Sequence, residues 1–287
     1  MWVSLLSVIL FACNARKVQA PEGGNPLGSC VITEATGEVP SDLYQNTGVI
    51  ESSEYAPFTK VLTVNGISLL GRDDNSDQFM QQVGETIAEM FATDVAGIDL
   101  STQETMIRHM YERNTAIPLF VGDDGFDLSG PDEDQFDSLQ EQNSICDVIY
   151  EYGGDGQTME VVEHILHHVS MVGLHYTFPN EWGVTQDSLL YQYMIEAQDN
   201  DYYNHNYNQL GNQTEGTRIA LQEYAYWVIS TGWDIQAQYG GDGGGGEWTL
   251  QNPEDFQSQQ AGMYSVFQET IELVMVSPSN ETLGGFE

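Results

Sequence analysis

The segment 155–178, DGQTMEVVEHILHHVSMVGLHYTF, restricts the fold more than any other part of this chain. At about 100° per residue, its apolar side chains fall on one face of a helix and its polar side chains on the other. The pattern therefore predicts a helix with one apolar face and one face rich in histidine. The apolar face is formed by Val161, Val162, Ile165, Leu166, Val169 and Val172.

The polar face of this predicted helix holds four of the chain's six histidines. Residues four apart are neighbours on a helix surface. Glu163 and His167 form one pair with this spacing, and His164 and His168 form another; either pair is able to chelate one metal ion. The alternative is a solvated polar face that is rich in histidine and binds no metal. The whole face comprises Glu160, Glu163, His164, His167, His168 and His175.

Strand patterns lie in the first half of the chain, and helix patterns prevail in the second. Asn65-Gly66 is a typical hairpin dipeptide between two short apolar strands. A third strand is expected at a sheet edge, because Pro118 cannot donate to a ladder. We therefore predict an α+β fold dominated by helix, with a small N-terminal sheet followed by a helical C-terminal half. The expected strands are 60–64, 66–70 and 116–121, and the expected helices are 76–93, 101–114, 155–178, 186–198, 217–231 and 254–275.

Local signals mark the ends of several elements. Ser76 is a natural N-cap for the first helix. Ser101 and Glu104 have the spacing of a capping box at the start of the second helix. The glycine-rich run 240–246 predicts a flexible surface loop.

The charge balance is strongly acidic, with 44 Asp and Glu against 7 Lys and Arg and a formal net charge of −37. Nucleic acid and anionic membranes are excluded as partners, because binding them requires Lys and Arg to neutralise phosphate. Such a surface suits a salty or calcium-rich medium, where screening weakens the self-repulsion. A marine or halophilic extracellular setting fits the composition, and so does acidity that serves only solubility.

The N-terminus predicts export. Trp2–Ala12 is an apolar stretch of signal-peptide length, too short to span a bilayer. We expect a signal peptide over 1–20, an irregular segment over 21–57 and a single globular domain over 58–287. Lipoprotein anchoring through Cys13 is the minor alternative. No later stretch is long and apolar enough to be a transmembrane helix.

Two further features fit an extracellular protein. If Cys13 leaves with the signal peptide, Cys30 and Cys146 remain, and a disulfide between them is the simple expectation in an oxidising compartment. Sequons at Asn212 and Asn280 are glycosylation sites if the source is eukaryotic.

The histidine-rich segment lacks one part of the familiar zinc peptidase motif, His-Glu-x-x-His. His164 and His168 have the motif's spacing, but Ile165 occupies the position of the general base. The pair Glu163 and His167 requires a third ligand and an open position for water if the site is catalytic. Glu223 is the best third ligand, because it is an acidic residue in a segment otherwise largely apolar and aromatic, where a carboxylate needs a partner. The alternative for Glu223 is a carboxylate at the exposed rim of its helix.

Calcium is the second cation that the composition suggests, because it prefers carboxylate oxygens. Two acidic clusters provide such ligands, although neither has the spacing of an EF-hand loop. In so acidic a chain a solvated loop is the alternative for both. The remaining histidines, His109 and His205, are expected at the surface. The clusters are Asp123, Asp124 and Asp127, and Asp132, Glu133 and Asp134.

Two short segments carry a resemblance to known proteins. They are 163–167, EHILH, and 223–227, EYAYW. They resemble segments of secreted, largely uncharacterised proteins of marine organisms, over about residues 155–231. The order of strands, helix, edge strand, ligand helix and helical C-terminal half is also similar to that of zincin metallopeptidases. That similarity implies that Glu223, on a later helix, completes a zinc site, while Ile165 departs from the zincin pattern.

Together these features predict a secreted, acidic, metal-binding protein, with zinc as the expected ion and a zinc-dependent hydrolase of zincin-like layout as the implied activity. The candidate ligands are Glu163, His167 and Glu223, with His164 and His168 as the alternative pair. The alternative function is a non-catalytic extracellular protein that binds calcium or a matrix partner.

Overall fold

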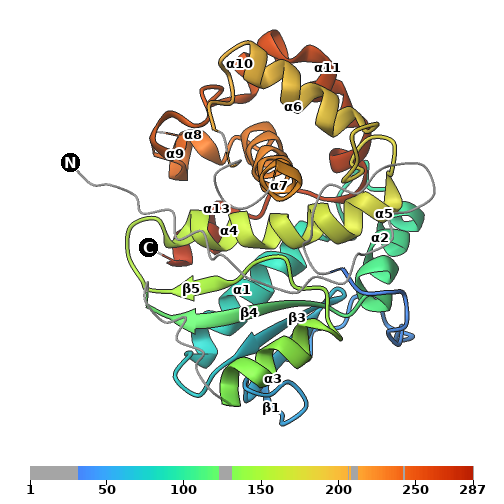
Figure 1. Ribbon diagram of the computed structural model, residues 1–287, viewed down its shortest axis with the longest axis vertical. Coiled ribbons are helices and arrows are strands. Elements are labelled where there is room, and N and C mark those ends of the chain that lie inside the picture. Colours follow the sequence, from blue (N-terminus) through green and yellow to red (C-terminus); the bar gives the residue numbers. More distant parts are fainter. Residues whose placement is uncertain (1–31, 123–130, 206, 208–212, 242, 287) are drawn as a thin grey trace.

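The computed structural model describes residues 32–122, 131–205, 207, 213–241 and 243–286 (Figure 1). A sheet lies at the lower end of the view in Figure 1, and a group of helices from the second half of the chain lies at the upper end. The helix α4 (Gln157–His168) runs between them. The predicted α+β class, with a small N-terminal sheet and a helical C-terminal half, is confirmed.

The sheet has five strands in chain order. Its first three strands pair antiparallel, and β3, β4 and β5 pair parallel. Asn65 and Gly66 have φ of 48° and 85°, as the tight hairpin between β2 and β3 requires, so the predicted hairpin is confirmed. The strands are β1 (Ile50–Glu51), β2 (Lys60–Val64), β3 (Ile67–Gly71), β4 (Thr115–Val121) and β5 (Ile149–Glu151).

Two expectations about the sheet were wrong. The strand β4 is not an edge strand, because it pairs with β3 on one side and with β5 on the other. Pro118 is tolerated because β5 pairs only with Leu119–Val121, beyond the proline, so the ladder on that side requires no N–H from it. The lead-in over 21–57 is also not wholly irregular, since it contains β1.

The two faces of the sheet are covered by different elements. On one face, α3 (Pro131–Gln140) contributes Phe136 and Leu139 to a small cluster with Phe58 and Phe120. On the other face lies a larger core that includes residues of α1 (Asp77–Met90), α2 (Leu100–Glu112) and α4. This larger core continues into the helices of the C-terminal half, so it extends across both faces of α4.

The first residues of α1 and α2 test the two N-caps that the sequence predicted. Ser76 caps α1 as predicted, because its hydroxyl accepts from the Phe79 N–H at 3.1 Å. The capping box expected at Ser101 is wrong: Asp99 is the N-cap of α2, and its carboxylate accepts from the N–H groups of Ser101 and Thr102. An Asp two residues earlier therefore takes the position that the Ser-x-x-Glu pattern suggested.

The histidine-rich segment is helical to Thr177. The helix α4 widens into a π-helical turn at Val169–Leu174 and ends in α5 (His175–Thr177). Its predicted apolar face is confirmed, since Val161, Ile165 and Val172 are fully buried. One face of this helix therefore closes the core over the sheet.

The remaining helices form the upper group in Figure 1 and the C-terminal end of the chain. The expected helix over 254–275 is broken at Gln260, whose φ of −127° and ψ of 54° leave the helical region. The glycine run was predicted to be a flexible loop, but Gly243–Gly246 form a tight turn, α9. These elements are α6 (Leu189–Asp199), α7 (Gln213–Gly232), α8 (Gln236–Tyr239), α9 (Gly243–Gly246), α10 (Pro253–Gln259), α11 (Ala261–Val266), the π-helical Phe267–Ile271, α12 (Glu272–Val274), α13 (Asn280–Leu283) and the 3₁₀ turn Gly284–Phe286.

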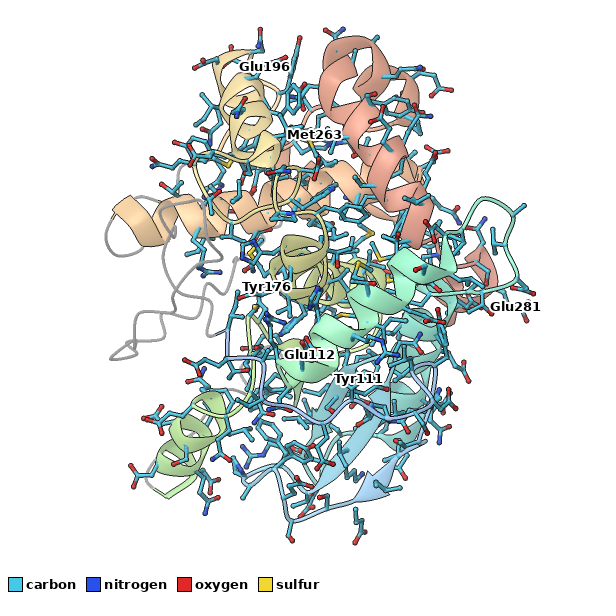
Figure 2. The ribbon with its side chains drawn as sticks, turned by 90° about the vertical axis from the view of Figure 1, so that its right-hand side faces the viewer. Tyr111, Glu112, Tyr176, Glu196, Met263 and Glu281 are labelled. Carbon is cyan, nitrogen blue, oxygen red and sulfur yellow. The ribbon has the colours of Figure 1, made fainter. Side chains whose placement is uncertain are left out.

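The end of α2 lies beside α5, in the region where Figure 2 labels Glu112 and Tyr176. The Arg113 guanidinium lies 3.4 Å from the centre of the Tyr176 ring, an attractive cation–π contact. His109 packs on the same ring, with ring centres 5.9 Å apart, and its side chain remains partly exposed at the surface. His175 is buried, and its Nδ1 accepts from the Val184 N–H at 3.0 Å. This histidine of the polar face is therefore structural.

Candidate metal centre

The polar face of α4 packs against α7. His167 is fully buried, and Glu163 and His164 are half-buried. Across the interface, α7 contributes Gln222 and Glu223, both buried. The alternative for Glu223, an exposed carboxylate at the rim of its helix, is therefore wrong, because its carboxylate lies in the interface between the helices.

The three favoured ligands meet in space. Ligand atoms of Glu163, His167 and Glu223 all lie within 4.8 Å of one another. The His167 Nε2 is 3.4 Å from a carboxylate oxygen of Glu223. That nitrogen is buried and has no hydrogen-bond partner. A buried polar atom without a partner costs free energy unless another species satisfies it.

The opposite side of the His167 ring determines its tautomer. Its Nδ1 lies 2.9 Å from the Oδ2 of Asp147, which precedes β5. A carboxylate only accepts hydrogen bonds, so Nδ1 carries the proton and donates. In the neutral ring Nε2 then has a lone pair, which faces the carboxylates of Glu163 and Glu223. Three acceptors converge on one point, which is the arrangement that a metal cation satisfies.

Asp147 is itself held in place from α7. The side-chain amide of Gln222 donates to the same Oδ2 at 3.2 Å. Arg218 donates to the Gln222 oxygen at 2.6 Å, which fixes the orientation of that amide. A carboxylate that orients a histidine ligand through its second nitrogen is a common support of metal sites. Asp147, Gln222 and Arg218 thus form a chain of hydrogen bonds that ends on His167.

The crowding of like charges shifts the pKa values here. Burial, and then the neighbouring Glu223, raises the pKa of Glu163 to about 8. Burial alone lowers the pKa of His167, but the carboxylates of Glu223 and Asp147 raise it well above its usual value. Burial alone raises the pKa of Asp147, but His164 and His167 hold it well below its usual value. When no cation is bound, protons on Glu163 and His167 therefore offset the negative charge of the neighbouring carboxylates.

A second group of ligand-type residues shares His167 with the first. It comprises Asp147, His164 and His167. The His164 Nδ1 lies 2.7 Å from the backbone oxygen of Glu160 and donates to it, and the His164 Nε2 is 3.7 Å from Asp147 Oδ1. Because His167 already donates its Nδ1 to Asp147, only two side chains of this group keep acceptor atoms. The first group is therefore the better metal site.

The alternative pair of His164 and His168 is wrong as a chelating pair. The His168 Nδ1 donates to the backbone oxygen of His164 at 2.8 Å, and its Nε2 accepts from the Cys146 N–H at 3.0 Å. Both ring nitrogens are thus committed to the backbone, and burial lowers the pKa of His168 to about 4. Spacing along the helix could not reveal this, because the partners come from the loop before β5.

The other predicted site residues lie elsewhere. Cys30 and Asn212 are outside the described residues, so the disulfide with Cys146 and the glycan at Asn212 stay predictions. Asn280 is exposed at the start of α13, a position compatible with a glycan.

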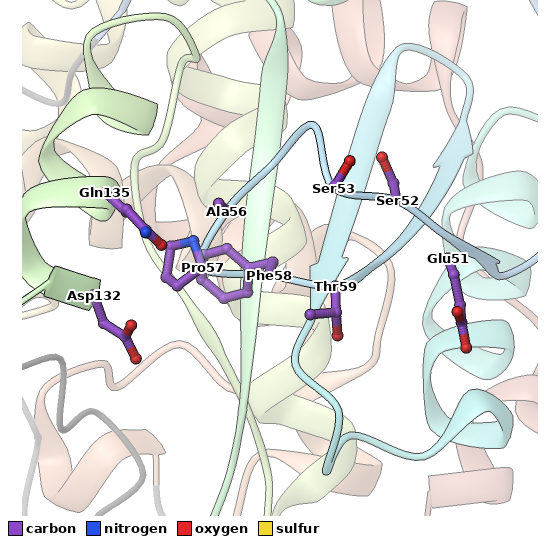
Figure 3. Close-up of a pocket in the computed structure, with 9 residues that line it drawn as sticks. All are labelled: Glu51, Ser52, Ser53, Ala56, Pro57, Phe58, Thr59, Asp132 and Gln135. Atoms are coloured by element: carbon purple, nitrogen blue, oxygen red, sulfur yellow. The ribbon is translucent and has the colours of Figure 1, made fainter.

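The first acidic cluster, Asp123, Asp124 and Asp127, is outside the described residues. Asp132 and Asp134 lie on α3, and Asp132 pairs with Arg72 at 3.6 Å. Figure 3 shows Asp132 and Glu51 among the residues that line a hollow near Pro57. The helix α3 belongs to the small core cluster, whereas α4 belongs to the larger one. Within the described residues, neither cluster contributes to a group of three metal-ligand side chains.

Sequence reasoning missed three residues of this region: Asp147, Gln222 and Glu247. Asp147 and Gln222 act on the candidate ligands only through contacts between distant segments, and no spacing pattern marks them. Glu247 is a buried carboxylate bonded to Tyr207 and Trp227. Its one sequence signal was its position directly after four glycines.

Comparison with models of protein families, with curated proteins and with solved structures found no match to this chain. Among the described residues, no helix is long and apolar enough to cross a membrane.

Proposed function

We propose that this protein binds a zinc ion through Glu163, His167 and Glu223. The observation that carries the proposal is the buried His167 Nε2, which has no hydrogen-bond partner and faces two carboxylates. An imidazole with two carboxylates suits zinc. Calcium prefers six to eight oxygen ligands, so it fits this centre poorly.

The proposal extends to hydrolysis by a metal-activated water. Three protein ligands leave the fourth position of a tetrahedral zinc ion free for water, as in catalytic zinc sites. Bound zinc lowers the pKa of that water and so supplies a nucleophile at neutral pH. Glu163 is half-buried, which places the centre near solvent.

The general base cannot come from the position that the His-Glu-x-x-His motif uses. Ile165 is fully buried in the core, on the face of α4 opposite to the ligands. A hydrolase built on this centre must therefore take its general base from a position other than 165. We also infer an extracellular location from the apolar segment Trp2–Ala12 and the net charge of −37.

The test is the metal content of the purified full chain, measured by mass spectrometry before and after dialysis against a chelator. We expect one zinc ion per chain, and its loss in the double variant Glu163→Gln/His167→Ala. The matched control is Glu85→Gln/His109→Ala, which removes the same two side-chain types from outside the centre and should keep the metal. A full complement of zinc in the first variant would refute the assigned ligands.

A further inference from the structure

A second cluster of ionisable side chains surrounds Glu247, outside both metal-binding groups. The Glu247 side chain is 4% exposed. One of its oxygens accepts from the Tyr207 hydroxyl at 2.9 Å and from the Trp227 indole N–H at 3.2 Å. The His205 Nδ1 lies 3.2 Å from the other oxygen. A buried carboxylate requires such donors, and these three hold it in one position.

The glycine run determines where Glu247 lies. Gly243, Gly244, Gly245 and Gly246 have φ of 66°, 66°, 74° and 95°. L-residues with a side chain avoid this left-handed region, whereas glycine enters it readily. Four glycines in succession thus build a left-handed turn that delivers the next residue, Glu247, to the interior.

The segment that carries His205 is paired with the segment that carries Glu247. Tyr203 and Trp248 form an antiparallel bridge, and the Asn204 N–H donates to the Glu247 backbone oxygen at 2.6 Å. This pairing places His205 beside Glu247 through the backbone, before any side-chain contact is considered. The association of the two is therefore a property of the fold.

The His205 ring is fixed on two sides and free on a third. It stacks on Tyr207 with ring centres 3.9 Å apart, and its Nδ1 faces Glu247. The side chain is 32% exposed. Its Nε2 has no hydrogen-bond partner among the described residues. A carboxylate on Nδ1 fixes the ring orientation. Burial lowers the pKa of the His205 imidazole, and the nearby Glu223 carboxylate opposes this shift.

This cluster and the metal centre lie on the same helix. Trp227, which bonds Glu247, follows Glu223 by one turn of α7, and residues four apart are neighbours on a helix surface. The charge of Glu223 also reaches the cluster: burial first, and then Glu223, raises the pKa of Glu247 to about 7. The two centres are therefore adjacent.

We propose that His205, oriented by Glu247, binds an oxyanion that occupies the open position of the metal centre. The inference rests on the proposed metal site. It gives the ligand a chemical class: a group with two oxygens, one on the metal and one hydrogen-bonded to the Nε2–H of protonated His205, whose Nδ1–H is donated to Glu247. The tetrahedral oxyanion that forms when water attacks an ester or amide carbonyl has this shape, so the substrate class is carbonyl compounds of that kind.

The test uses the full chain loaded with Co²⁺ in place of zinc, with inorganic phosphate as the oxyanion probe and visible absorption as the readout. We expect phosphate to change the Co²⁺ spectrum of the unmodified protein. His205→Ala should weaken phosphate binding about tenfold, the effect of losing one hydrogen bond to a charged group, with Co²⁺ content unchanged. Glu247→Gln should weaken it less, because the histidine remains.

The matched control is His109→Ala, because His109 is also partly exposed and also pairs its Nδ1 with a glutamate, at 3.3 Å. That variant should bind phosphate like the unmodified protein. Equal phosphate affinity in His205→Ala, or no spectral response in the unmodified Co²⁺ protein, would overturn the inference while the metal site stands. Failure of the unmodified protein to retain Co²⁺ would overturn the metal site itself, and this result is distinguishable from the other two.

Discussion

Asp147 offers the sharpest test of how the metal centre is assembled. Its Oδ2 accepts from His167 at 2.9 Å and from Gln222 at 3.2 Å, and its Oδ1 accepts from the Val148 N–H at 2.9 Å. It lies outside the ligand set Glu163, His167 and Glu223. Its replacement therefore leaves the three proposed ligands in place and alters how His167 is presented to the proposed metal ion.

We predict that Asp147→Asn lowers zinc affinity about tenfold, and that Asp147→Ala lowers it about a hundredfold. Asparagine keeps an oxygen that accepts from the His167 Nδ1–H but loses the charge that makes the ring more basic. Alanine loses the acceptor as well, so the ring is free to rotate or to change tautomer. These factors correspond to about 1.4 and 2.7 kcal/mol of binding free energy.

The assay is competition for zinc against a chromophoric chelator of known affinity, at pH 7.5 and fixed salt. Asp132→Asn is the control, because Asp132 lies on α3, away from the centre. Circular dichroism would show that each variant is folded. Unchanged zinc affinity in Asp147→Ala would refute the conclusion that the Nδ1 contact holds His167 in the binding tautomer.

Three further predictions concern the pH dependence of stability, a glycine with positive φ and a helix N-cap. Burial, and then Glu223, raises the pKa of Glu163 to about 8, so the metal-free fold binds an extra proton there and should lose stability as pH rises from about 4.5 to 8. Bound zinc should remove that loss, and thermal unfolding with and without zinc measures both effects. Gly245→Ala should lower the free energy of unfolding by about 1–2 kcal/mol, because alanine is strained at the Gly245 φ of 74°. Gly284→Ala is the control and should change that free energy little, because the Gly284 φ is −69°. Urea unfolding measures both variants. Ser76→Ala should cost about 1 kcal/mol through loss of the α1 cap, and equal urea midpoints for variant and parent would contradict this.

Periodicity was sufficient for most of the fold. The hairpin at Asn65-Gly66 and the buried face of α4 follow from local pattern alone, because twofold and 3.6-fold repeats are properties of a single element. The edge position predicted from Pro118 was wrong because it is not a property of a single element. Whether a strand lies at an edge depends on its neighbour, and β5 is only three residues long, in a segment without a strong strand pattern.

The candidate site was partly predictable for a similar reason. Helical spacing brought Glu163 and His167 together, and an acidic residue in an apolar segment singled out Glu223. His168 had equally good spacing but is bonded to the backbone, a fact that depends on the loop at Cys146. Asp147 carries no sequence pattern, and Glu247 is marked only by the four glycines before it, because both roles arise from contacts between segments far apart in the chain.

The position of the ligands on two helices has a consequence for how this protein assembles. His167 and Glu223 are 56 residues apart in the chain (223 − 167), and everything between them, including α6, forms a loop that a bound ion closes. Closing a loop in the unfolded chain carries an entropic cost that rises slowly with loop length. An ion that binds only the folded chain also shifts the folding equilibrium by mass action. Zinc would thus act as a reversible cross-link between the half of the chain that carries the sheet and the half that carries α7, so the helical half should become protease-sensitive first when the ion is withdrawn.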